Sequence, residues 1–161
     1  MRDASYSLEL VTGPESEPLE GDFVRDQHLR VASGSAEDDY IEHLIKAARR
    51  MAERITRRAL MTQTWSMSME RFPACGEIVI PRPPLQSVES IVYLDENGVE
   101  QTWGGSPLPY DVTTPSGPSA KYGRIRPAYD EVWPTTRSQS MASTYRSAAF
   151  RPKTGSYAAL T

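Results

Sequence analysis

Few side chains in this chain of 161 residues have the types and spacing of a metal or catalytic site. The two histidines, His28 and His43, lie in separate helical patterns, and neither has a second ligand at a zinc-site spacing. The single cysteine, Cys75, lies in a Pro/Gly-rich turn, where no helix N-terminus would favour a reactive thiolate. We therefore expect packed or surface histidines, no metal, no cofactor and no nucleophilic cysteine.

Two carboxylates beside an aromatic ring are the remaining candidates for chemistry. Asp130 and Glu131 precede Trp133, an arrangement that a small hydrolase or a carbohydrate-binding β domain could use. A loop with one packed tryptophan explains the same residues equally well. The chain has no phosphate-binding glycine loop, GxSxG or HExxH motif, and no pattern unites a base, a nucleophile and an oxyanion site. The sequence favours a protein that is not an enzyme, with this cluster as the alternative.

Basic residues are concentrated near the end of the longest helical pattern. Acids precede them and no aromatic residue interrupts them, which favours a solvated or subunit-facing surface over a reader of duplex DNA. Weak, non-specific contact with DNA inside a channel would also suit this pattern. The candidates for ring contacts or channel lining are Lys46, Arg49, Arg50, Arg54, Arg57 and Arg58.

The formal net charge of −3 hides an asymmetry between the two parts of the chain. Residues 1–45 carry eleven acids and three bases, whereas residues 46–161 carry ten acids and fifteen bases. Such a dipolar chain can stack on copies of itself with opposite charges meeting. The simpler explanation is a helix with acids at its start and bases at its end, followed by a solvated tail.

A long helix is expected over 36–60. Ser35 can cap it, acids fill its first turn, and apolar residues recur at three- and four-residue steps. A shorter helix is expected over 19–31. We predict that the long helix is the structural spine, and that the side chains facing inward are Ile41, Leu44, Ala48, Met51 and Ile55.

After residue 60 the apolar period changes to two, which predicts strands. Residues 61–127 are expected to form a small antiparallel β meander, with an Asn-Gly hairpin turn at 95–98. The predicted strands cover 61–69, 77–80, 88–94, 99–103, 110–112 and 124–126. With the helix pair before them, they make the chain α+β.

The length suits one domain with extensions. Residues 1–18 form an N-terminal arm in which Ser7–Val11 could add a strand to a sheet edge, 19–137 form the domain, and 138–161 form an extended C-terminal tail. The acidic start of the chain is not a secretory signal. A mean hydropathy of −0.52 and the absence of an apolar run near ~20 residues exclude a membrane span.

The order and spacing of short motifs over about 17–137 carry a family resemblance. These motifs are Glu17-Pro18-Leu19, His28-Leu29-Arg30-Val31, Glu37-Asp38-Asp39, Ala47-Ala48-Arg49, Ile55 to Leu60, Gln63-Thr64-Trp65, Phe72-Pro73, Ile78 to Leu85, Ser87-Val88, Ser90 to Tyr93, Asp95, Gly98, Tyr110, Arg124-Ile125 and Trp133-Pro134. With them the chain resembles the head–tail connector (adaptor) proteins of long-tailed bacteriophages and the related gene transfer agents.

The resemblance implies a structural role without catalytic residues or cofactors. Such adaptors form a ring, usually of twelve copies, between the portal and the stopper or tail, and they continue the DNA channel. It implies a location in the neck of a virion or virus-like particle that is assembled in the host bacterial cytoplasm, with no membrane partner.

Two departures from the family pattern stand out: Gly21-Asp22 interrupts the first helix, and 138–161 lacks the usual strand and C-terminal helices. We expect this basic, aromatic-bearing tail to bind the portal protein. Its contact candidates are Tyr145, Arg146, Phe150, Arg151, Lys153 and Tyr157.

Overall fold

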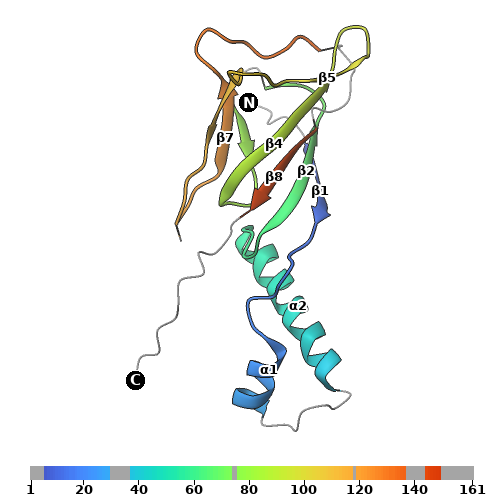
Figure 1. Ribbon diagram of the computed structural model, residues 1–161, viewed down its shortest axis with the longest axis vertical. Helices are drawn as coiled ribbons and strands as arrows, with labels where there is room; N and C mark the ends of the chain where they lie inside the picture. Colours follow the sequence, from blue (N-terminus) through green and yellow to red (C-terminus); the bar gives the residue numbers. More distant parts are fainter. Residues whose placement is uncertain (1–5, 30–36, 74–75, 118, 137–143, 150–161) are drawn as a thin grey trace.

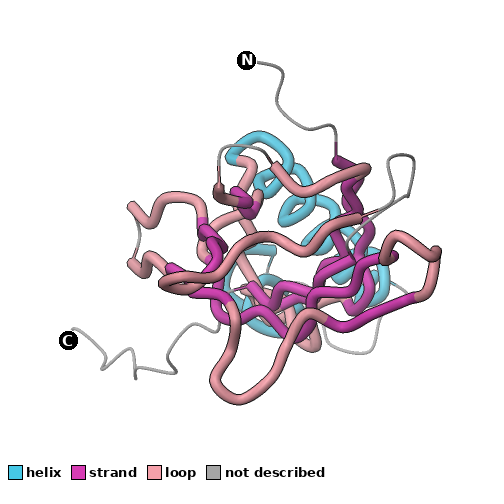
Figure 2. Tube along the Cα trace, turned by 90° about the horizontal axis from the view of Figure 1, so that it is seen from above, coloured by secondary structure: helices cyan, strands magenta, loops and turns pink. Residues whose placement is uncertain are grey.

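The computed structural model describes residues 6–29, 37–73, 76–117, 119–136 and, for the backbone, 144–149 (Figure 1). Two antiparallel sheets make up the upper part of the molecule, and two helical segments make up the lower part (Figure 1). Figure 2 looks down on the strands, with the helices beneath them. The described chain is therefore α+β, as the sequence predicts.

The larger sheet has five strands in the order β1-β2-β8-β4-β5. The smaller sheet has the order β3-β7-β6. Their bounds are β1 Tyr6–Thr12, β2 Gln63–Met69, β8 Thr144–Ala149, β4 Leu85–Leu94 and β5 Glu100–Thr102 in the first, and β3 Ile78–Ile80, β7 Gly123–Pro127 and β6 Tyr110–Thr113 in the second.

Local strand predictions agree well with the structure. In β2 the buried side chains include Gln63, Met67 and Met69, which follow the expected period of two. The Asn-Gly turn closes the β4–β5 hairpin, where the Asp95 side chain accepts the backbone N–H groups of residues 97 and 99, each at 2.9 Å. The hydrogen bond from the Val99 N–H is the largest of the interactions that lower the pKa of Asp95. The N-terminal segment is an edge strand, since β1 pairs only with β2 in the sheet order.

The expected meander over 61–127 is present only in part. Within this range β4–β5 and β6–β7 join consecutive strands, whereas β3 pairs with β7, and β2 pairs with β1 and β8 from outside the range. A period of two places side chains on a face but does not choose the strand partner.

The predicted extended tail is wrong for residues 144–149. These residues form β8, which lies between β2 and β4 in the larger sheet (Figure 1). The strand carries several small residues and has no clear apolar alternation, so its pairing on both sides, rather than its own pattern, makes it a strand. The rest of the predicted tail lies outside the described residues.

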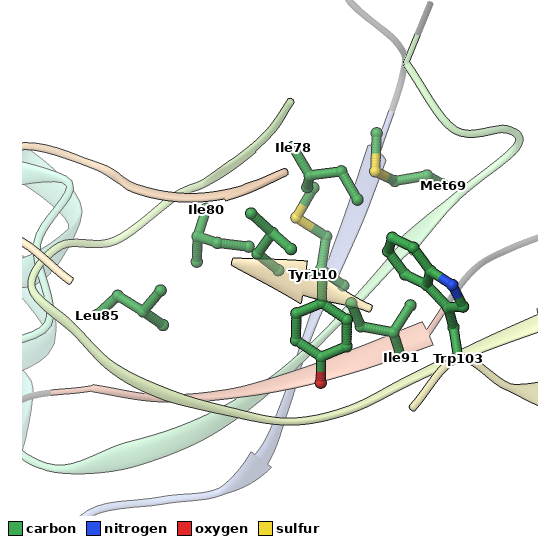
Figure 3. Packing of buried hydrophobic residues seen from close by; sticks show 9 residues of the cluster. Met69, Ile78, Ile80, Leu85, Ile91, Trp103 and Tyr110 are labelled. Carbon is green, nitrogen blue, oxygen red and sulfur yellow. The ribbon is translucent and has the colours of Figure 1, made fainter. Parts of the chain in front are cut away.

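The core draws side chains from both sheets. Ile78, Ile91 and Ile125 are fully buried, and they come from β3, β4 and β7. All three belong to one apolar cluster, in which Figure 3 shows Ile78 and Ile91 with the larger side chains of Trp103 and Tyr110. Burial raises the pKa of the Tyr110 hydroxyl. This apolar cluster holds the two sheets together.

Gly123 marks a close approach of β7 to β4. A Cβ built at this position would lie 2.6 Å from Leu85 Cβ and 3.0 Å from Leu85 Cγ. We expect Gly123→Ala to lower the free energy of unfolding by about 1–3 kcal/mol, because the sheets must move apart. Urea unfolding measures this cost. Gly13→Ala is the control, since a Cβ there meets nothing within 4 Å, and an equal loss in both variants would contradict the prediction.

The helical part begins with a short pair of segments, α1 (Gly21–Val24) and one π-helical turn, η1 (Arg25–Leu29). The long helix α2 (Glu37–Thr56) follows and projects away from the sheets (Figure 1). The expected helix over 19–31 is thus confirmed in outline. The proposed Ser35 cap lies outside the described residues.

Candidate functional site

The long helix α2 buries a different face from the one that the sequence predicts. Its buried side chains recur at four-residue steps: Ile41, Ile45, Arg49 and Glu53. Only Ile41 belongs to the predicted inward set. Of that set, Leu44 is 50% exposed, Met51 58% and Ile55 69%, and Ala48 is exposed as well.

The buried face is stabilised by an ion-pair network centred on Arg49. Arg49 Nε donates to Glu17 Oε2 at 2.6 Å, and its Nη2 donates to Glu17 Oε1 at 3.2 Å. Its Nη1 donates to Glu53 Oε2 at 2.8 Å. The hydrogen bond to Glu17 is the main interaction that raises the pKa of Arg49. Arg49 therefore ties the N-terminal segment to the middle of α2, and it is not available to line a channel.

The other oxygen of Glu53 fixes the end of α2. Glu53 Oε1 accepts the backbone N–H of Leu60 at 2.9 Å and the Gln63 side-chain amide at 2.7 Å. The helix ends at Thr56, before the predicted residue 60, because Arg57 adopts a left-handed backbone with φ 53°. The chain then turns directly into β2, so this carboxylate couples helix and sheet.

Arg25 holds the short helical segments against the start of α2. It pairs with Asp22 at 2.8 Å, with Asp26 at 2.9 Å and with Asp38 at 3.4 Å. The hydrogen bond to Asp26 is the largest of the interactions that raise the pKa of Arg25. Gly21 lies on the same side, where an added Cβ would contact Glu42 Cγ at 3.6 Å. The short segments thus cover one side of the N-terminal half of α2.

Neither of these ion-pair networks, the one centred on Arg49 or the one centred on Arg25, is predicted from the sequence. The Arg49–Glu53 pair has the four-residue spacing of a helical ion pair, which is a usable signal. Glu17 is 32 positions from Arg49 and carries no local signal.

The six predicted basic candidates do not form one surface. Arg50, Arg54 and Arg57 are exposed. Lys46 pairs with Glu42 at 3.4 Å, and Arg58 Nη1 donates to the Ala120 carbonyl at 2.9 Å. With Arg49 buried, the exposed part of the basic cluster is reduced mainly to Arg50 and Arg54 on α2 and Arg57 directly after it.

The Asp130/Glu131/Trp133 cluster does not have the geometry of a carbohydrate site. The Trp133 ring stacks on Phe72, with centroids 4.8 Å apart and an interplanar angle of 16°, and it also lies 4.9 Å from Trp103. Phe72 therefore covers one face of the Trp133 ring. Asp130 and Glu131 are exposed, and Asp130 adopts a left-handed backbone with φ 62°. The packed-tryptophan interpretation fits better.

The two histidines have the surroundings of packed or surface side chains. His28 packs edge-on against Phe23 with centroids 6.1 Å apart, and His43 is exposed. Within the described residues, no three His, Cys, Asp or Glu side chains gather in a way that could hold a metal ion. No described helix has the length and apolar character needed to span a bilayer.

The predicted portal contacts lie mostly beyond the described part of the chain. The structure gives a backbone position for Tyr145 and Arg146, which are part of β8. The remaining candidates, and Cys75, lie outside the described residues: Phe150, Arg151, Lys153 and Tyr157.

Comparison with solved structures identifies similar folds. One similar chain comes from the neck of an empty gene transfer agent (GTA) particle, computed with C6 symmetry; its TM-score is 0.69 at 20% identity, over 89% of this chain and 70% of that chain. Another comes from the virion of a native GTA particle, with a TM-score of 0.68 at 22% identity, over 89% of this chain and 71% of that chain. The fold is shared with these particle chains. No family model matches the sequence, and no curated protein does.

Proposed function

We propose that this chain is a structural subunit of the neck of a phage-like particle. In this role it is an adaptor that forms a ring between the portal and the stopper or tail and continues the DNA channel. The observation that carries the proposal is the fold likeness to a chain of a GTA neck over 89% of the present chain. The ordered motifs over 17–137 support the same role independently of the fold comparison.

The projecting helix gives this role a physical basis. A helix that leaves the body of its own subunit and exposes large apolar side chains is suited to contacts with other subunits. Its exposed arginines, Arg50, Arg54 and Arg57, are the proposed ring or channel residues. If they line the channel, they contact phosphates without base readout, which suits a passage for DNA of any sequence.

The proposed portal contact is the end of the chain. The described part of β8 ends at Ala149, which pairs with Gln63 of β2 and Leu85 of β4. We assign the portal contact to Phe150, Arg151, Lys153 and Tyr157, whose aromatic and basic side chains suit anchoring in polar-rimmed pockets.

Electron microscopy of the protein mixed with purified portal from the same particle tests this function. We expect a ring of this chain bound coaxially to the portal. A chain that ends at Ala149 is the matched variant: it should retain the fold and lose most portal binding. A full-length protein that forms no ring, alone or on the portal, would contradict the adaptor role, whereas full portal binding by the shortened chain would contradict only the tail contact.

A further inference from the structure

The exposed apolar face of α2 forms a continuous surface. Its side chains follow steps of four, four, three and four residues, which keeps them on one side of a helix. They include large side chains that are at least half exposed, and they differ from the face buried against the same subunit. We call this surface the α2 stripe, and its members are Tyr40, Leu44, Ala48, Met51 and Ile55.

A second exposed apolar surface lies on the short helical segments. Leu19, Phe23 and Leu29 are each about half exposed. They alternate with exposed acids, and Arg25 offsets only part of that negative charge. We call this surface the α1–η1 face. Its exposed acids are Glu20, Asp22 and Asp26.

The two surfaces are complementary in charge. Arg50 and Arg54 are exposed on α2 beside Met51 and Ile55, so the C-terminal half of the stripe has a basic border, whereas Glu37 and Asp39 are exposed in the first turn. The α1–η1 face combines similar apolar side chains with an acidic border. Apolar surfaces bordered by opposite charges favour each other and disfavour their own kind, because like charges would otherwise meet.

The two surfaces cannot meet within one subunit. The short segments pack on the side of α2 that carries Asp38 and Glu42, where Arg25 reaches Asp38 and Gly21 lies next to Glu42. The stripe lies on another side of the same helix. A subunit with two different complementary surfaces facing different directions makes head-to-tail contacts, and such contacts close into a ring when the rotation allows it.

Resting on the proposed ring function, we propose that the α2 stripe of each subunit docks on the α1–η1 face of the next copy of this chain. The apolar side chains form the centre of this contact. Arg50 and Arg54 of one copy lie toward the acids of the α1–η1 face of its neighbour. In this contact, acids from the first part of the sequence in one copy face bases from the second part of the sequence in the next copy.

Leu44→Glu tests the stripe, and Leu108→Glu is its matched control. Both leucines are about half exposed, at 50% and 52%, but Leu108 lies in the loop before β6, away from the helices. We expect both variants to melt like wild type. Leu44→Glu should raise the concentration needed for half-maximal ring formation more than about tenfold, and Leu108→Glu should leave it unchanged.

Mixing two defective variants tests the pairing of the two surfaces. Leu44→Glu copies keep an intact α1–η1 face, and Leu29→Glu copies keep an intact stripe. Each variant alone should stay monomeric by native mass spectrometry, and their mixture should form one-to-one pairs without rings. Met51→Glu serves as a second stripe variant, with Phe23→Glu as a second variant of the α1–η1 face.

The outcomes separate this contact from the proposed function. If wild type forms rings and Leu44→Glu forms them equally well, the contact is wrong while the adaptor role stands. Unfolding of both stripe variants would place the stripe inside the subunit and would also overturn the contact. Absence of pairs in the mixture would contradict head-to-tail docking. A wild-type protein without rings in solution or on the portal would contradict the adaptor role itself.

Discussion

A chain that ends at Arg137 is expected to lose cooperative thermal unfolding, because it lacks the strand β8. β8 pairs with β2 from Gln63 to Met67 and with β4 from Leu85 to Val92. Its removal leaves two strand edges without partners and separates β1–β2 from β4–β5. The expected loss is comparable with the whole stability of a domain, about 5–15 kcal/mol.

The control is the chain that ends at Ala149, which retains β8 and lacks only the residues after it. Circular dichroism melting should show a transition close to that of the full-length chain for this control and none for the shorter one. If both shortened chains melt like the full-length protein, β8 contributes nothing to the subunit fold. The pair also separates loss of portal binding from loss of folding.

Strand positions could be predicted from sequence because they depend on local patterns. The alternation in β2 and the Asn-Gly turn after β4 are both visible within a few residues. The Ser7–Val11 segment also has a local alternation, from which the sequence predicts a possible edge strand. Partners could not be predicted, since β8 joins β2 and β4 from the far end of the sequence, and nothing in six consecutive residues specifies a partner at that separation.

The prediction for the inward face of α2 is wrong because it assumes that the apolar face of a helix is always buried within its own subunit. An apolar face is expected inward, and a face with Arg49 and Glu53 is expected outward. In the structure the face with Arg49 and Glu53 is buried instead. Its burial is possible because Glu17 accepts a hydrogen bond from Arg49 and Gln63 donates one to Glu53. The stripe is then left exposed on the subunit surface, where we propose that a neighbouring copy covers it. The sequence pattern thus identifies an apolar face, but not whether that face packs within the subunit.

Arg49→Met is expected to lower the free energy of unfolding by about 3–5 kcal/mol, the cost typical of breaking a buried ion pair from one side. Arg49 is 7% exposed and Glu53 is 4% exposed. Without the guanidinium, the Glu53 carboxylate keeps two hydrogen bonds, from Leu60 and Gln63, but loses its ion pair with Arg49. Glu17 loses both of its hydrogen bonds to Arg49.

Arg54→Met is the matched control, because it makes the same substitution five residues further along the same helix at an exposed position. It should change the free energy of unfolding by less than about 0.5 kcal/mol. Arg49→Lys should fall between the two, since lysine keeps the charge but cannot bridge Glu17 and Glu53 with a planar fork. Urea unfolding with equal m-values across the set measures the differences. Equal stability of the Arg49→Met and Arg54→Met chains would show that the network does not hold the N-terminal segment on α2.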